Sequence, residues 1–139
     1  MIWAVIDTTV RVSGFGWGGP PGQVVDRFVA GEFLPVTSPP LLDELAEVLH
    51  RDKFTAVFPD PDRLVALVQS STAFVIPQSK LNAFADESDN RLLEAAAEAD
   101  ADFIVTGDKA VLDFGRFEQT RMVTPRRFIE VLDAERDRR

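Results

Sequence analysis

The feature that most constrains the fold is a pair of short segments built from consecutive apolar residues. Residues 2–6 read Ile-Trp-Ala-Val-Ile without a polar residue, and the strand expected at 103–106 begins with Phe-Ile-Val. A strand with one face in water alternates polar and apolar side chains, whereas a strand covered on both faces is apolar throughout. The two segments are therefore predicted to be strands of a parallel sheet that helices cover on both faces.

Amphipathic segments lie between these candidate strands. Helical spacing of apolar residues is found over 39–51, 60–70 and 89–99, and a last helix is predicted to begin at Thr124-Pro125. Ser38 is expected to cap the helix that starts at residue 39. Further apolar spacing at Val24, Val25, Phe28 and Val29 predicts a helix that Gly31 ends. Shorter strands are expected at 33–36, 74–76 and 121–123, a loop at Gly14–Gly22, and irregular chain at 78–88.

Alternating strands and helices predict an α/β fold, here a three-layer α/β/α sandwich around a mostly parallel sheet. A chain of 139 residues fits one domain, which we expect to span 1–134, with a charged tail at 135–139. Hydrophobic residues make up 45% of the sequence, and no run reaches the roughly 18 residues of a membrane span. Because no basic region precedes the first apolar run, we expect a cytoplasmic protein without a membrane partner.

Several kinds of chemistry are excluded by composition. The chain has no cysteine, so it has neither a disulfide framework nor a thiolate zinc site. His50 is the single histidine, which rules out a histidine pair acting as acid and base within one chain. We expect His50 to lie in the last turn of a helix, where its partial positive charge suits the dipole. The net charge of −8 argues against a protein that coats nucleic acid with a basic face, although bound metal ions would reverse the local field.

Two aspartates follow these two predicted strands. Asp7 comes directly after residues 2–6, and Asp108 follows the run from Phe103 to Gly107. In parallel sheets, ligands bind outside the carboxyl ends of the strands, so Asp7 and Asp108 are candidates for one site. Taken alone, Asp108 could equally be a turn residue or a helix cap.

Two further acids point inward by helical geometry. At about 100° per residue, Glu44 lies about 40° from Val48 at the edge of the apolar arc, whereas Glu47 lies on the polar face. Asp89 precedes Leu92 by one turn and projects over the buried face of its helix, unless it merely caps the helix start. Asp86 competes with it for a metal-binding role, and Asn90 is a candidate for the rim of the site.

Carboxylates brought together need a counter-charge. Two unit charges at about 4 Å repel by about 4 kcal/mol at an effective dielectric constant of about 20. Several such pairs would cancel much of the roughly 5–15 kcal/mol that stabilises a domain. The pattern therefore predicts a hard divalent cation bound by oxygen ligands, Mg²⁺ or Mn²⁺.

The chain resembles PIN domains in four motifs with the family's order and spacing, and the likeness extends to the step at Val123-Thr124-Pro125. The motifs are Asp7-Thr8-Thr9-Val10, Ser38-Pro39-Pro40-Leu41-Leu42-Asp43-Glu44-Leu45, Asp86-Glu87-Ser88-Asp89-Asn90 and Val105-Thr106-Gly107-Asp108. The likeness is greatest to the VapC-like toxins of bacterial toxin–antitoxin systems.

This resemblance implies an Mg²⁺- or Mn²⁺-dependent endoribonuclease with Asp7, Glu44, Asp89 and Asp108 as its metal-binding and catalytic acids. In the family's usual mechanism a metal-activated water attacks the RNA phosphodiester and leaves a 5′-phosphate. Such toxins are commonly homodimers held inactive by a cognate antitoxin. RNA, an antitoxin protein and a second copy of the chain are thus the expected partners.

One position departs from the family pattern: Thr9 stands where asparagine or serine is usual. Its hydroxyl could still support a carboxylate, but an amide's donors are lost, so the alternative is a catalytically weak or inactive PIN-like protein that binds protein or RNA. Thr9 also argues against a haloacid-dehalogenase-type phosphatase, which needs a second aspartate there. Arg11 and Lys109, next to the motifs, are candidate phosphate contacts, with solvated surface charge as the simpler interpretation.

Overall fold

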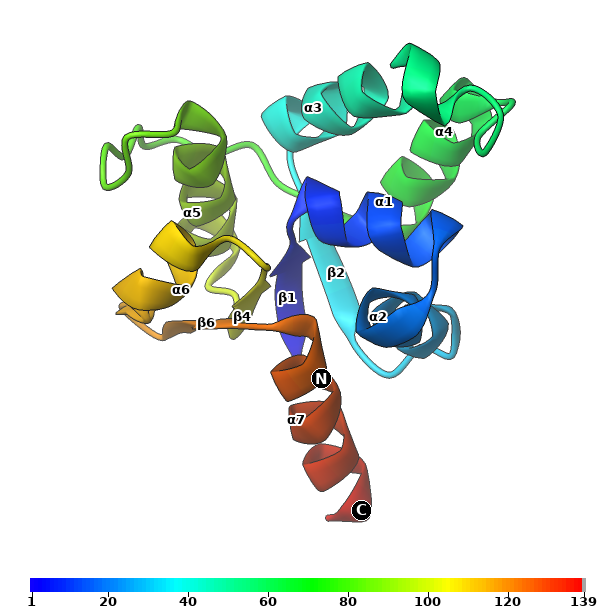
Figure 1. The fold of residues 1–139 in the computed structure, drawn as a ribbon. Helices are drawn as coiled ribbons and strands as arrows, with labels where there is room; N and C mark the ends of the chain where they lie inside the picture. The colour runs from blue at the N-terminus through cyan, green and yellow to red at the C-terminus, as the bar shows by residue number, and fades with distance from the viewer. Residues whose placement is uncertain (139) are drawn as a thin grey trace.

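A computed structural model describes residues 1–138 and arranges them as a central sheet with helices around it (Figure 1). In chain order the elements are β1 (Trp3–Ile6), α1 (Thr8–Gly16), α2 (Gly19–Val29), β2 (Leu34–Thr37), α3 (Pro39–Leu49), a 3₁₀ turn (Asp52–Phe54), α4 (Pro61–Ser71), β3 (Ala73–Phe74), α5 (Glu87–Ala99), β4 (Phe103–Val105), α6 (Lys109–Phe114), β5 (Arg116–Phe117), β6 (Thr120–Val123) and α7 (Pro125–Asp137). The predicted α/β architecture is confirmed.

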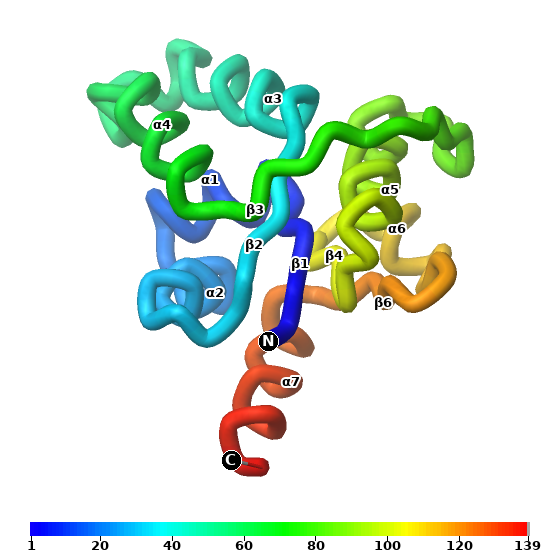
Figure 2. The backbone as a smooth tube through the Cα atoms, turned by 180° about the vertical axis from the view of Figure 1, so that it is seen from behind, coloured from blue at the N-terminus to red at the C-terminus, as the bar shows by residue number. Residues whose placement is uncertain are grey.

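The sheet has six strands in the order β3-β2-β1-β4-β6-β5. All neighbouring strands are parallel except β5 and β6, which are antiparallel. The view from behind shows β1 at the centre, with β2 and β3 to one side of it and β4 to the other (Figure 2). The two continuously apolar segments are thus the two neighbouring strands β1 and β4 in the middle of the sheet.

The side chains of β1 explain why this strand has no polar residue. Val5 belongs to a core that includes Leu92 and Leu93 of α5, whereas Ala4 and Ile6 belong to a second core on the opposite face. That second core contains residues of α1, α2 and α7, among them Phe128 of α7. Helices therefore cover both faces of β1, as its sequence predicts.

The loop predicted at Gly14–Gly22 is wrong, because α1 continues to Gly16 and α2 begins at Gly19. Asp7 caps α1, and prolines occupy the first turn of α2, where proline suits a helix start. Gly14 serves helix packing instead of a turn. A Cβ at Gly14 would come within 2.6 Å of the Pro21 carbonyl oxygen, so its lack of a side chain lets α1 and α2 approach.

Most other predicted elements are present within one to three residues of their expected bounds. The strand at 74–76 is shorter and shifted, and α1, α6 and β5 were not expected. His50 is the C-cap of α3, with its imidazole Nδ1 2.7 Å from the Ala46 carbonyl oxygen. Helix α7 continues to Asp137, three residues beyond the expected domain limit, and Arg139 lies outside the described residues. Within residues 1–138, no helix has the length and apolar character needed to span a bilayer.

We expect Phe128→Ala to destabilise the protein by about 3–5 kcal/mol, the usual range for deleting a buried aromatic side chain. Phe128 is fully buried, and its ring meets Phe33 edge-on at 4.9 Å between centroids. Urea unfolding followed by circular dichroism measures the loss. The matched control, Phe74→Ala, changes a ring that is 43% exposed and should cost much less; equal losses would contradict this account of the core.

Candidate metal centre

The register of the central strands brings Asp7 beside Thr106. Ile6 of β1 pairs with Val105 of β4, so the next residues leave the sheet together at its carboxyl edge. Thr106 is fully buried, and its hydroxyl donates a hydrogen bond of 2.7 Å to Asp7 Oδ2. The same hydroxyl oxygen accepts a bond of 3.0 Å from the Asp108 backbone N–H. One threonine thus links the two strand-end aspartates.

Three carboxylates meet next to this edge. Asp86, Asp89 and Asp108 each offer an oxygen atom, and these atoms lie within 4.8 Å of one another. Asp86 caps α5 by accepting a bond from the Ser88 N–H, and Asp108 caps α6 through the Ala110 N–H. Each cap uses the Oδ1 atom, so capping and cation binding are compatible roles.

The environment of Asp89 opposes its ionisation. Its pKa is raised to about 7, first by burial and then by the charges of Asp108, Asp86 and Asp7. Only 5% of Asp89 is exposed, because α5 turns it towards the sheet. Near neutral pH, Asp89 is therefore close to the midpoint of its titration, and a bound cation would favour loss of its proton.

Asp7 and Glu44 border the three-carboxylate group but are not members of it. The pKa of Asp7 is raised because burial outweighs the hydrogen bonds from Thr106 and Thr9, and the charge of Asp108 adds to the effect. The pKa of Glu44 is raised by burial and then by the charge of Asp7, against the hydroxyl groups of Thr8 and Ser88, which lower it. All of these acids thus share one electrostatic environment.

The structure brings together part of the predicted set and adds to it. Asp89 and Asp108 lie within ligand distance of each other, and Asp86, expected only as a competitor or rim residue, is the third member. Thr106 was missed as a supporting residue, although its place at the end of a buried strand was a usable signal. The hydroxyls of Thr8 and Ser88 lie within the motifs quoted above, but the sequence does not indicate that they interact with Glu44.

Thr9 and Asn90, which were expected to support or border the site, have other interactions in the structure. Thr9 is exposed, and its backbone N–H lies 3.4 Å from Asp7 Oδ1. Asn90 is fully buried and clamps the preceding loop: its Oδ1 accepts the Ala83 and Phe84 N–H groups, while its Nδ2 donates to the Phe84 carbonyl oxygen. Asn90 is therefore not on the rim, since its amide is used in holding that loop to α5.

The two basic candidates also differ. Arg11 as a phosphate contact is wrong for this site, because it is 8% exposed and its Nε donates to the Ile6 carbonyl oxygen on the apolar side of α1. Lys109 is next to Asp108 and exposed, with its Nζ 2.6 Å from Asp113 Oδ2. Of these two candidates, Lys109 is the exposed one and follows a member of the acidic cluster in the sequence.

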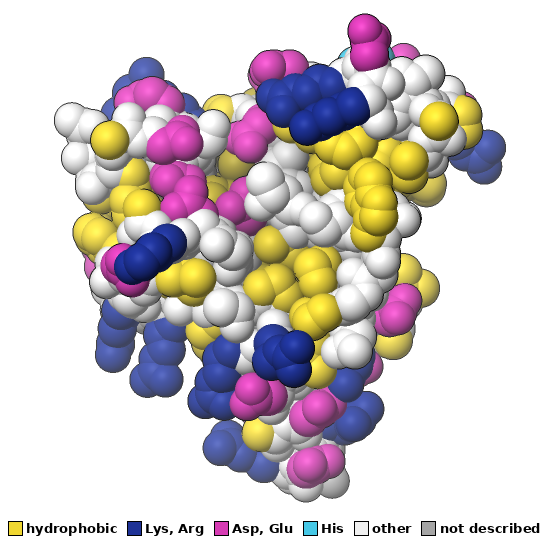
Figure 3. Space-filling view, in the orientation of Figure 1, with side chains coloured by type: hydrophobic (Ala, Val, Ile, Leu, Met, Phe, Trp, Pro, Cys, Tyr) yellow, Lys and Arg dark blue, Asp and Glu magenta, His cyan; other side chains and the backbone are white. Residues whose placement is uncertain are grey.

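In the space-filling view, acidic side chains gather in a hollow between the side of the molecule formed by α5 and α6 and the side formed by α1 and α3 (Figure 3). All ligands available in the cluster are carboxylate oxygens. Oxygen-only sites suit Mg²⁺ and Mn²⁺, whereas zinc sites usually contain nitrogen or sulfur ligands. The residues present thus fit a hard divalent cation.

Comparisons with known proteins agree with the fold. The family model of the PIN domain matches residues 4–110. The chain is 29% identical over 141 residues to an uncharacterized protein of Methanocaldococcus jannaschii, MJ1680, covering 93% of this chain and 90% of that protein. The crystal structure of PAE2754 from Pyrobaculum aerophilum superposes with a TM-score of 0.56 at 13% identity, over 96% of this chain and 90% of the other. At that identity the superposition shows a common fold.

In the absence of divalent metal, we expect stability to fall as pH rises through the range set by Asp89. Below pH 3.8 both folded and unfolded states are protonated at Asp89; between 3.8 and about 7 only the unfolded state ionises, and that favours unfolding. Asp89→Asn should therefore be more stable than the wild type at pH 8, by up to about 4 kcal/mol, the free energy that corresponds to the full shift of the Asp89 pKa.

Urea unfolding in EDTA at several pH values measures this difference. Asp26→Asn, an exposed aspartate on α2, is the matched control and should follow the wild type. A pH dependence of Asp89→Asn identical to that of the wild type would contradict the raised pKa.

Proposed function

Because the chain belongs to the PIN domain family, whose members are typically metal-dependent nucleases, we propose that it is an endoribonuclease dependent on Mg²⁺ or Mn²⁺. The observation that carries the proposal is the meeting of Asp86, Asp89 and Asp108 within 4.8 Å at the carboxyl edge of the sheet. Without a bound cation, charge repulsion and burial in such a cluster lower the free energy of unfolding, so we expect the cluster to have a function. The raised pKa of Asp89, about 7, is the electrostatic sign of that cost.

In this proposal Asp86, Asp89 and Asp108 hold the cation, with Asp7 beside them. A bound divalent cation would lower the pKa of a coordinated water and stabilise negative charge on a phosphoryl oxygen. Thr106 fixes the orientation of Asp7 through its hydroxyl, so that the carboxylate cannot turn away from the site. Burial and the charge of Asp7 raise the pKa of the half-buried Glu44, which makes its carboxylate a stronger base and a candidate proton acceptor.

Substrate binding must overcome the protein's own charge. The chain carries a net charge of −8, so a bound cation would be the main attraction for an RNA phosphate at the acidic hollow. Lys109 is the proposed auxiliary contact, since it is 86% exposed and its ion pair among residues 1–138 is with Asp113 on its own helix. Exposed pairs of this kind exchange partners at little cost.

We further propose that the protein is the toxin of a toxin–antitoxin pair, acting in the cytoplasm as a homodimer that a cognate antitoxin holds inactive. The support is the similarity of its four acidic motifs to those of VapC-like toxins, from Asp7-Thr8-Thr9-Val10 to Val105-Thr106-Gly107-Asp108.

The second candidate is an inactive PIN-like protein that binds protein or RNA, and it was motivated by Thr9. The hydrogen bonds of Asp7 argue against this second candidate. Asp7 is held by the Thr106 hydroxyl and by the Thr9 backbone N–H, and neither bond uses the Thr9 side chain. A weak site therefore does not follow from threonine at position 9.

We expect the wild type to cleave single-stranded RNA when Mn²⁺ is added. Asp89→Asn and Asp7→Asn should each lose at least about 100-fold in rate, because even residues that only orient metal ligands are usually worth 10–100-fold. Cleavage of a fluorescent oligoribonucleotide, followed by gel analysis of the 5′ end, measures both the rate and the predicted 5′-phosphate.

Helix α3 offers a matched pair for the same assay. Glu44→Gln should lose activity, whereas Glu47→Gln should keep it, because Glu47 is exposed on the far side of the helix. Cleavage at equal rates by the wild type, Asp7→Asn and Asp89→Asn would end the catalytic assignment.

Metal binding can be tested without RNA. We expect Mn²⁺ to raise the melting temperature of the wild type, since a ligand that binds only the folded state stabilises it by about 2.7 kcal/mol at 100 times its Kd. The shift should vanish in Asp89→Asn and shrink in Asp7→Asn, while Asp26→Asn keeps it. A wild type insensitive to Mn²⁺ in differential scanning fluorimetry would favour the binding protein instead.

A further inference from the structure

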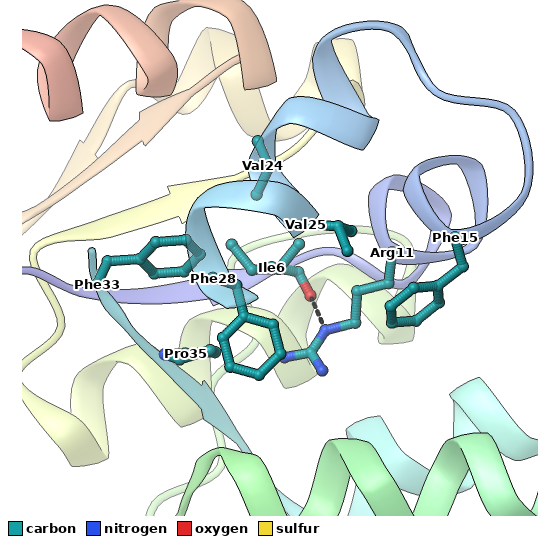
Figure 4. A pocket seen from close by; sticks show the side chains of 8 residues that line it. All are labelled: Ile6, Arg11, Phe15, Val24, Val25, Phe28, Phe33 and Pro35. Atoms are coloured by element: carbon teal, nitrogen blue, oxygen red, sulfur yellow. Dashed lines mark hydrogen bonds between the residues drawn. The ribbon is translucent and has the colours of Figure 1, made fainter. Parts of the chain in front are cut away.

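The side chain of Arg11 is mostly buried, although its terminal guanidinium nitrogens are not among the fully buried polar atoms that lack a partner and so remain within reach of a ligand. The residue is 8% exposed, and the hydrogen bond it makes runs from Nε to the Ile6 carbonyl oxygen at 3.4 Å (Figure 4). Arg11 takes part in none of the ion pairs found within residues 1–138. Burial lowers its pKa to about 10, so the group still carries its charge at neutral pH. A charge in such a place normally has a counter-ion.

The surroundings of this charge are apolar and open outward. Arg11 extends between Phe15 and Phe28 into a narrow pocket of about 20 Å³ that Ile6 and Pro35 also line (Figure 4). The rings of Phe15 and Phe28 also line a wider groove of about 450 Å³ between α2 and α4. At the groove, Val29 is 78% exposed and Leu67 54% exposed. The result is one buried cation beside a long apolar surface.

We propose that this is a binding site for an unbranched aliphatic carboxylate, with the carboxylate on Arg11 and the hydrocarbon tail in the groove between α2 and α4. A carboxylate matches the fork of N–H donors of a guanidinium and forms short, charge-assisted bonds with it. The tail would cover the exposed side chains of Val29 and Leu67, which water otherwise surrounds.

The dimensions favour a slender ligand. The narrow pocket has room for little more than one water molecule, whose centre needs roughly 10–15 Å³, so only the end of a thin group reaches the guanidinium. A nucleotide would place polar sugar hydroxyls against phenylalanine and valine. An extended peptide would bring N–H and C=O groups that need partners, and Ser71 is the one polar residue among the described residues lining the groove. An aliphatic chain needs none.

This site is separate from the metal centre. It shares no residue with the group of Asp86, Asp89 and Asp108, and it faces the α2 side of α1. Binding of an aliphatic carboxylate can therefore be measured in EDTA, where nuclease activity plays no part, and either proposal can fail without the other.

Isothermal titration of the full chain with sodium decanoate, below the concentration at which it forms micelles, tests the proposal. We expect saturable binding to one site, with affinity rising up to about fourfold per methylene from hexanoate to decanoate, the gain for burying each CH₂. Decanol, which has the tail without the charge, should bind at least tenfold more weakly.

Variants separate the two parts of the site. Arg11→Met, similar in size and uncharged, should reduce decanoate affinity at least tenfold, and Arg11→Lys should retain part of it. Leu67→Glu, at an exposed position, should also weaken binding, because it places a negative charge beside the tail. Arg126→Met, an exposed arginine on α7, is the matched control and should bind as the wild type does.

The proposal is overturned if decanoate fails to saturate the wild type, if decanol binds as tightly, or if Arg11→Met binds unchanged. Should Arg11→Met not fold, the chain-length series on the wild type and the Leu67→Glu variant still decide it. Arg11-dependent binding of an acidic amphipathic peptide, without binding of decanoate, would also overturn it and assign the groove to a protein partner.

Discussion

The site depends on the parallel register between β1 and β4. Ile6 pairs with Val105, and this pairing sets Asp7 against the Thr106 hydroxyl one residue beyond the sheet. A slip of one residue would turn Asp7 towards the other face and bury it against leucine or phenylalanine. The register is fixed because both faces of both strands are packed, with Val5 and Ile104 in one core and Ala4, Ile6 and Val105 in the other. Packing of the central strands is thus the source of precision at the acids.

These acidic residues in turn lower the stability of the fold that positions them. Burial and like charge raise the pKa values of Asp7, Glu44 and Asp89 together, so each ionised carboxylate makes the folded state less favourable. Helix caps offset part of this cost, since Asp86 and Asp108 each satisfy a backbone N–H at the start of a helix. A divalent cation would offset the rest. Cation binding and folding are therefore expected to be coupled, as for any ligand that binds only the native state.

The parts of the fold and site that could be predicted are those where one local rule acts alone. Continuous apolar sequence identifies β1 and β4, and helical angles select Glu44, half-buried, over the exposed Glu47. The loop predicted from Gly14 is wrong, because glycine favours a turn locally, whereas here it permits close contact between α1 and α2. Asp86 was predicted only as a competitor for the metal-binding role, because locally it is the N-cap of α5. Its place among the three carboxylates depends on the approach of Asp108, which caps a different helix. Long-range approaches of this kind leave no pattern in a single sequence.

Asp7 and Arg11 show how far tertiary structure overrides local attraction. Opposite charges four residues apart on a helix usually pair, and Arg11 would then neutralise Asp7. Asp7, however, is the N-cap residue, and its carboxylate bonds Thr106 and the Thr9 N–H, while Arg11 turns to the Ile6 carbonyl oxygen between Phe15 and Phe28. Because the two side chains leave α1 in different directions, neither charge is neutralised by the other. A single short helix thus keeps the carboxylate of Asp7 and the guanidinium of Arg11 apart, which is why we propose a separate ligand of opposite charge for each.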